Sequence, residues 1–170
     1  MTGGPPRRLR MLAALAAVPE ALPLPEGLAA PRAVRRDDLR ALGRLAFRAY
    51  RDSVDDHGES EAWHSEDLRA ALDGRYGSYM DVGRVVEDGA GDLVAAALVT
   101  WHADLPLLAF CLTDPAWRGR GVATHLIATC ARALEAAGHR EMHLAVTDGN
   151  PAQALYARLG FRVVPIPVRP

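Results

Sequence analysis

Hydrophobic residues recur along residues 27–170 with two spacings, every second residue in some stretches and every third or fourth in others. The first spacing is typical of strands and the second of helices that bury one face, so the pattern predicts a mixed α/β domain. Strands are predicted at residues 29–34, 79–87, 93–101, 105–113 and 143–147. Helices are predicted to begin at Arg36, Ser65 and Val122. Short turns separate the strands between residues 79 and 113, which favours an antiparallel meander.

Residues 1–26 precede this pattern as an N-terminal arm. Three arginines before an apolar stretch at residues 11–18 imitate a secretory signal, but Pro19 and Glu20 follow that stretch at once and no small-x-small cleavage site closes it. We instead predict a short amphipathic helix, followed by a proline-rich connection to a single domain at residues 27–170. The residues expected on one side of this helix are Leu9, Leu12, Ala13 and Ala16.

Composition narrows the class of protein. With 170 residues, 20 Lys+Arg against 21 Asp+Glu and 49% hydrophobic residues, the chain can bury a core and carries almost no net charge. This balance disfavours a nucleic-acid partner, and no apolar run approaches the roughly 18 residues that span a membrane. Cys111 and Cys130 lack the spacing of a disulfide framework, which indicates a reduced, cytoplasmic protein. The six histidines show no metal-ligand spacing, so no metal site is expected.

A candidate anion site follows the predicted strand that ends at Thr113. A glycine-rich turn at residues 117–121 leads directly into a predicted helix, whose N-terminus presents unpaired backbone N–H groups. Gly119 and Gly121 lack a Cβ, so the backbone there can approach phosphate oxygens closely. A Walker-type loop is excluded because all 20 basic residues are arginine. A dinucleotide fingerprint is excluded because Thr124 stands where that motif needs a third glycine.

Two motifs together resemble one known family. The residues R-G-R-G-V-A at 118–123 match the Arg/Gln-x-x-Gly-x-Gly/Ala pattern of the GCN5-related N-acetyltransferase (GNAT) family. Downstream, N-P-A-Q-A-L-Y at 150–156 and L-G-F at 159–161 resemble the family's second segment, in the same order. The resemblance covers residues 28–166. It implies the GNAT fold, a mixed α/β architecture in which a largely antiparallel sheet of about six to seven strands, splayed at its centre, is flanked by about four helices.

The resemblance also implies an activity. A protein of this family would transfer the acetyl group of acetyl-CoA to a primary amine by direct attack in a ternary complex. Because a thioester is already activated, the protein mainly has to position the reactants and manage protons. The pyrophosphate is then expected on the glycine turn and the pantetheine arm along the end of the preceding strand. The residues that the resemblance assigns to cofactor binding are Cys111, Leu112, Thr113, Arg118, Gly119, Arg120, Gly121, Val122, Ala123, Thr124 and Asn150.

Amine acetylation requires two proton transfers, one from the substrate ammonium and one to the leaving thiolate. Tyr156 matches the family's tyrosine and is the candidate acid near the CoA sulfur, unless its ring serves only to pack the core. The glutamate that some family members use as a base corresponds here to Leu107, which cannot accept a proton. Asp104 is our candidate base. The alternatives that stay open are a water chain to solvent and the side chains of His102, Asp56 and Glu59.

The segment at residues 51–61 forms part of the acceptor pocket in the family that this sequence resembles. It carries five carboxylates in the ten residues from Asp52 to Glu61, which would concentrate a cationic amine. We therefore expect a small cationic amine or a peptide as acceptor, although the charges of a solvated loop would look the same. The expected contacts are Asp55, Asp56 and Glu59.

Two other classes of protein stay open. Leu107 is compatible with a non-catalytic acyl-CoA-binding sensor or a degenerate member of the family. The anion site alone would also suit a nucleotide-binding regulator, which a thermal-shift screen would separate from a CoA-binding protein. Whether residues 163–170 pair with a second subunit in a homodimer is also left open.

Overall fold

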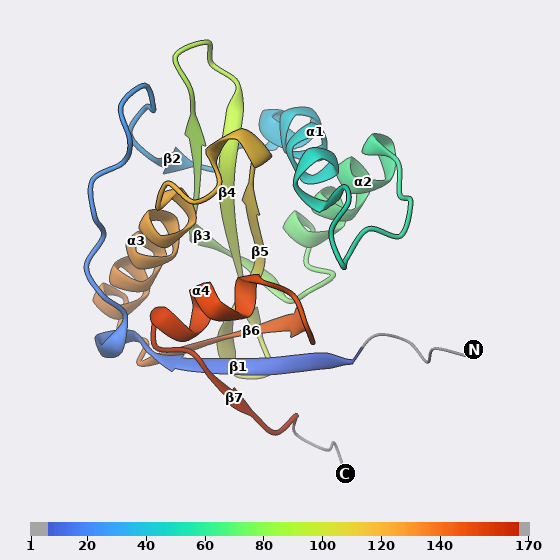
Figure 1. Ribbon diagram of the computed structural model, residues 1–170. Helices are drawn as coiled ribbons and strands as arrows, with labels where there is room; N and C mark the ends of the chain where they lie inside the picture. The colour runs from blue at the N-terminus through green and yellow to red at the C-terminus, as the bar shows by residue number, and fades with distance from the viewer. Residues whose placement is uncertain (1–6, 167–170) are drawn as a thin grey trace.

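A single seven-stranded sheet organises the molecule, with the strand order β2-β3-β4-β5-β6-β1-β7 (Figure 1). The computed structural model describes residues 7–166. The strands are β1 (Arg8–Ala14), β2 (Arg32–Ala33), β3 (Ser78–Glu87), β4 (Leu93–His102), β5 (Leu105–Thr113), β6 (Glu141–Thr147) and β7 (Arg162–Val164). The α-helices are α1 (Leu39–Tyr50), α2 (Glu61–Leu72), α3 (Val122–Ala136) and α4 (Ala152–Arg158). The predicted mixed α/β architecture and the antiparallel β3-β4-β5 meander are both confirmed.

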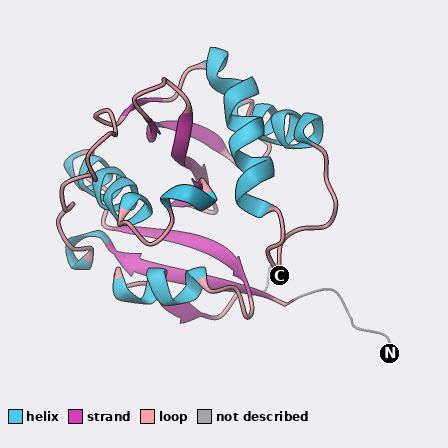
Figure 2. Ribbon diagram, turned by 45° about the horizontal axis from the view of Figure 1, so that its top comes forward, coloured by secondary structure: helices cyan, strands magenta, loops and turns pink. Residues whose placement is uncertain are grey.

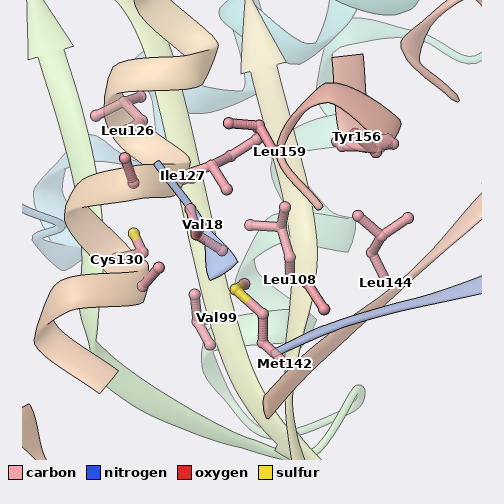
Figure 3. Close-up of a cluster of buried hydrophobic side chains, with 14 of the residues drawn as sticks. Val18, Val99, Leu108, Leu126, Ile127, Cys130, Met142, Leu144, Tyr156 and Leu159 are labelled. Atoms are coloured by element: carbon pink, nitrogen blue, oxygen red, sulfur yellow. The ribbon is translucent and has the colours of Figure 1, made fainter. Parts of the chain in front are cut away.

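Helices cover both faces of the meander. The pair α1 and α2 packs on one face and α3 on the other, as the cyan helices on either side of the strands show in Figure 2. Strand β4 is therefore buried on both faces, which explains its nearly continuous apolar sequence. Its Val99 faces the α3 side, where Figure 3 shows Leu126, Ile127 and Cys130 projecting from the helix, whereas Leu98 faces α1 and α2.

The N-terminal arm differs from the prediction. Residues 8–14 do not form a helix but the strand β1, which is paired antiparallel with β6 on one side and β7 on the other. Met11 and Ala13 are buried while Leu12 between them is less so, which is the two-residue alternation of a strand. A short apolar run is compatible with both the helical and the strand period. Here the run forms a strand because β6 and β7 each offer an edge with which it can pair.

Two element boundaries also shifted. Helix α2 begins four residues before the predicted Ser65, because the Ser60 hydroxyl caps it by accepting a hydrogen bond from the Trp63 N–H at 3.1 Å. The predicted first strand shrinks to β2, preceded by one bridge between Leu28 and Asp88.

The sheet opens between β5 and β6, as the family resemblance implied. These parallel strands are paired only at Leu107 and His143. On its other side β5 pairs with β4, where the register shifts between Leu98 and Val99. The shift makes a bulge in β5, so Leu108 faces α3 while Phe110 faces α1 and α2. Beyond this point β5 and β6 diverge, and a cleft lies between them.

Helices α1 and α2 approach closely at Gly43. We expect Gly43→Ala to lower the free energy of unfolding by about 1–3 kcal/mol, because overpacking forces the helices apart. A Cβ at this position would lie 1.8 Å from the Oγ and 2.8 Å from the Cβ of Ser65. Urea unfolding measures the change. Adding Ser65→Gly should restore most of the loss, although glycine in a helix costs about 1 kcal/mol. An unchanged unfolding midpoint for Gly43→Ala would contradict this close contact.

Candidate active site

The cleft between β5 and β6 has a volume of about 980 Å³. Its walls come from β5, the turn before α3, β6, α4 and the segment from the end of α1 into α2. Leu108 of β5, Leu144 of β6 and Tyr156 of α4 lie around the opening between the two strands (Figure 3). Segments far apart in the sequence thus meet at one place, and every motif singled out in the sequence contributes to it.

One end of the cleft presents backbone N–H groups that have no backbone partner among the described residues. Gly119 and Gly121 have φ angles of 71° and 81°, the left-handed region that favours glycine. The first backbone bond of α3 runs from the His125 N–H to the Gly121 carbonyl at 2.9 Å, so the N–H groups of residues 119–124 donate to no backbone carbonyl of the described chain. A Cβ at either glycine would meet nothing within 4 Å. The glycines are therefore needed for their backbone conformation, and the space in front of the N–H groups is open.

The turn is fixed to helix α1 by two arginines. The Arg118 guanidinium donates to the Ala49 carbonyl at 2.5 Å, near the end of α1. Arg48 donates to the Asp114 carboxylate at 2.6 Å, and the other oxygen of Asp114 accepts from the Ala116 N–H at 2.9 Å. Arg118 lines the cleft as predicted. These contacts hold the N–H groups in place before any ligand arrives.

Some predicted cofactor residues do not reach the cleft with their side chains. The guanidinium of Arg120 lies 5.0 Å from the Trp117 ring centroid, on the surface outside the cleft lining. The Leu112 side chain is 1% exposed and packs in the core beneath α1 and α2. Leu112 can contact a ligand only through its backbone, on an edge of β5 that has no strand partner past Leu107 in the described residues. The remaining residues assigned to cofactor binding line the cleft, namely Cys111, Thr113, Arg118, Gly119, Gly121, Val122, Ala123, Thr124 and Asn150.

Tyr156 and Cys111 are neighbouring side chains on the wall of the cleft. Burial raises the pKa of the Cys111 thiol to about 12 and also raises the pKa of Tyr156 well above 10, so both groups are protonated at neutral pH. The Tyr156 ring packs edge-on against Phe161, with the centroids 5.9 Å apart. The residue therefore combines a core-packing ring with a hydroxyl that carries a proton at the cleft surface.

Asn150 and Asp55 tie two walls of the cleft together. The Asn150 amide donates to the Asp55 carboxylate at 2.8 Å, and its Oδ1 accepts from the Ala152 N–H at the start of α4, also at 2.8 Å. The same carboxylate accepts from the Thr147 hydroxyl and lies 3.7 Å from the Arg8 guanidinium. Both residues line the cleft, but these contacts make Asp55 a structural link between the α1–α2 loop and β6.

The other acidic residues predicted for the site are dispersed. Glu59 lines the cleft, half-buried, with its carboxylate accepting from the His57 N–H at 3.1 Å. Asp56 lies outside the cleft lining and closes its own loop by accepting from the Asp52 and Gly58 N–H groups, bonds that lower its pKa. Asp104 is exposed in the turn between β4 and β5, also outside the cleft lining, and this position does not suit a base for the cleft.

The sequence did not predict the wall of the cleft that α2 forms. Trp63, His64 and Asp67 project from α2 into the cleft beside Tyr50 and Tyr76. The sequence predicts this helix only from Ser65 on, which leaves Trp63 and His64 in the preceding loop. Their spacing to Asp67 within one helix was the available signal, because residues three and four apart share a helix face.

The described residues contain neither a candidate metal site nor a candidate membrane span. Among residues 7–166, no three His, Cys, Asp or Glu side chains are arranged to hold a metal ion. No helix there combines the length and the apolarity needed to cross a membrane.

Comparison with known proteins gives one consistent result. The model of the acetyltransferase (GNAT) family matches residues 39–161. A GCN5-related N-acetyltransferase from Sphaerobacter thermophilus aligns with a TM-score of 0.69 and 23% identity over 92% of this chain and 48% of that one. This chain thus spans about half the length of that protein. No curated protein matches it significantly.

Two structures of coenzyme A complexes share the fold. PaiA N-acetyltransferase from Thermoplasma acidophilum, in complex with coenzyme A, has a TM-score of 0.64 and 15% identity over 81% of this chain and 91% of that one. An aminoglycoside N-acetyltransferase in complex with CoA has a TM-score of 0.62 and 19% identity over 87% of this chain and 98% of its own. The expected fold is therefore confirmed.

Proposed function

The chain belongs to the GNAT family of acetyltransferases, and on that premise we propose that it transfers the acetyl group of acetyl-CoA to a primary amine. The observation that carries the proposal is the continuity of the cleft. It runs from the unpaired N–H groups at the start of α3, along the free edge of β5, to the hydroxyl of Tyr156. A long ligand with a pyrophosphate at one end and a thioester at the other matches this layout.

Each part of the cleft has a task in this reaction. The N–H groups of residues 119–124 and the α3 dipole bind the pyrophosphate, and the β5 backbone accepts and donates hydrogen bonds along the pantetheine arm. The amine nitrogen attacks the thioester carbonyl carbon directly, the C–N bond forms and the C–S bond breaks. Tyr156, protonated at neutral pH, supplies the proton to the leaving thiolate.

The acceptor in this proposal is a cationic amine. Glu59 and Asp67 place carboxylates on the α2 side of the cleft, and Asp55 adds a third nearby. A concave surface with charges of one sign concentrates ligands of the opposite sign. A small amine or the terminus of a peptide would meet this surface as a cation.

A screen of amines with CoA release as the readout tests the proposal. Acetyl-CoA should bind to the purified protein, and at least one cationic amine should release free thiol at a rate well above hydrolysis. Failure of every amine, with CoA binding retained, would overturn the enzymatic proposal. The alternative that would then hold is a non-catalytic acyl-CoA-binding protein, which is favoured by Leu107 lining the cleft where some relatives carry a base.

The contribution of the acidic wall can be measured at Glu59. We expect Glu59→Gln to raise the KM for a cationic acceptor about threefold to tenfold with little change in kcat, because one attractive charge is lost. Glu66→Gln is the matched control, since Glu66 is exposed on α2 outside this cleft and pairs with Arg69 at 3.4 Å. Steady-state kinetics at low ionic strength makes the comparison. Equal KM values for Glu59→Gln and Glu66→Gln would show that the charge of Glu59 does not attract the acceptor.

A further inference from the structure

His64 lies at the acceptor side of the cleft in an aromatic setting. The residue is 6% exposed and lines the cleft from α2. Its ring stacks on Tyr50 with the centroids 5.5 Å apart and an interplanar angle of 22°. Trp63 and Phe47 contact it edge-on at 5.2 and 6.4 Å. These contacts hold the imidazole in one orientation.

Both ring nitrogens of His64 are available to a ligand. Neither ring nitrogen of His64 has a hydrogen-bond partner in the described part of the chain. His143 is the contrast, because its Nδ1 accepts from Arg10 at 3.3 Å and its Nε2 donates to the His102 carbonyl at 3.2 Å. A buried histidine whose polar atoms have no protein partner, on the wall of a cleft, is open to a ligand.

Two half-buried carboxylates that line the same part of the cleft are already engaged. Asp67 accepts from the Tyr76 hydroxyl at 2.6 Å and lies 3.6 Å from the Arg75 guanidinium. Asp55 is bound by Asn150 and Thr147. His64 is thus the buried titratable group of the cleft whose proton-accepting atom is free.

The charge state of His64 suits a base. Burial lowers its pKa, and the carboxylates of Glu59, Asp67 and Asp56 act in the opposite direction. On the α1 side it faces Tyr50, a phenol whose own pKa burial raises, so that side adds no charge. The imidazole is therefore neutral at pH 7 and able to accept a proton.

We propose that His64 is the base that accepts a proton from the acceptor ammonium. The proposal rests on the acetyl transfer proposed above. The ammonium gives one proton to a ring nitrogen of His64, and the neutral amine attacks the thioester carbon. After the attack the nitrogen loses a second proton, and this proton replaces the one that Tyr156 delivers to the CoA sulfur. The net products are therefore the amide, CoA and one proton, which His64 releases to solvent. Tyr50 stacks on His64, and both residues line the cleft together with Cys111 and Tyr156.

The pH dependence of kcat/KM tests this role. With His64 as base, kcat/KM should stay level from the pKa of His64, below 6.5, up to the pKa of the acceptor amine, and fall tenfold per pH unit below that range. In His64→Gln only the free amine can react, so kcat/KM should be about a hundredfold lower at pH 7 and rise tenfold per pH unit. The Kd for CoA should stay within about twofold, which a collapsed site would not allow.

Two further variants make the result decisive. His64→Phe keeps the stacked ring without a basic nitrogen and should reproduce the His64→Gln profile even if glutamine disturbs folding. His139→Gln, outside the cleft beside Trp101, should behave as the wild type. A His64→Gln or His64→Phe enzyme that keeps the level profile, at full or reduced rate, would overturn the proposal. If the wild type releases no CoA with any amine, acetyl transfer itself fails, and the role of His64 fails with it.

Discussion

Gly121→Glu should abolish CoA binding, with a Kd at least about 1,000-fold higher than that of the wild type, a change of about 4 kcal/mol. The added carboxylate would occupy the open space before the N–H groups at the start of α3 and repel the pyrophosphate that they bind. The φ angle of 81° adds strain of about 1–2 kcal/mol for any residue with a side chain. Calorimetric titration with CoA measures the loss.

Gly138→Glu provides the matched control. Gly138 has a φ angle of 90°, follows the other end of α3, and would also place a Cβ in open space. It carries the same backbone strain and the same added charge without touching the cleft, so its CoA affinity should equal that of the wild type while its stability falls. Retention of CoA binding by a folded Gly121→Glu protein would refute the anion site.

Tyr156→Phe should lower kcat about a thousandfold while the Kd for CoA hardly changes. The ring that packs on Phe161 is kept, and only the hydroxyl, on a residue that lines the cleft beside Cys111, is lost. Without that proton donor, the CoA sulfur must leave as a thiolate. Rapid-quench measurement of amide formation separates this step from product release.

Tyr79→Phe is the corresponding control at a hydroxyl outside the cleft. The Tyr79 hydroxyl is buried without a hydrogen-bond partner among the described residues, so its removal should leave activity intact and stability equal or higher. Equal kcat values for the two tyrosine variants would show that the Tyr156 ring, and not its hydroxyl, explains the position of this residue.

Local patterns were enough to predict most of the fold. The continuous apolar run at residues 93–101 and the helical spacing after Val122 each correspond to an observed element. A strand buried on both faces is apolar throughout, and a helix packed on a sheet buries every third or fourth residue. Strand β1 was missed because its seven residues carry no decisive period. Its conformation depends on β6 and β7, which lie more than a hundred residues away and are invisible to a local reading.

The site residues, too, were predictable where they belong to a local motif and not where the tertiary structure brings them together. The turn at residues 118–123 and Tyr156 belong to contiguous motifs, and Tyr156 and every residue of the turn except Arg120 line the cleft. Asp104 and Asp56 were chosen for proximity in sequence and charge, but the turn and the loop that carry them hold them outside the cleft lining. The sequence does not predict His64 because this residue reaches the cleft only when α1 and α2 pack on β5, a contact between segments far apart in the chain.

The position of β1 sets the order in which the chain can fold during synthesis. Arg8 pairs with Thr147, so the strand emerges from the ribosome on the order of 10 s before its partner. Over that interval the apolar side of β1 has no place to be buried, while β3, β4, β5 and α3 can already assemble with one another. Strand β6, which forms one wall of the cleft, can enter the sheet together with β1 only after residues 141–147 have been synthesised. The cleft is therefore complete only after residue 147 has left the ribosome, and a chaperone that holds extended apolar segments would find its target at residues 8–14.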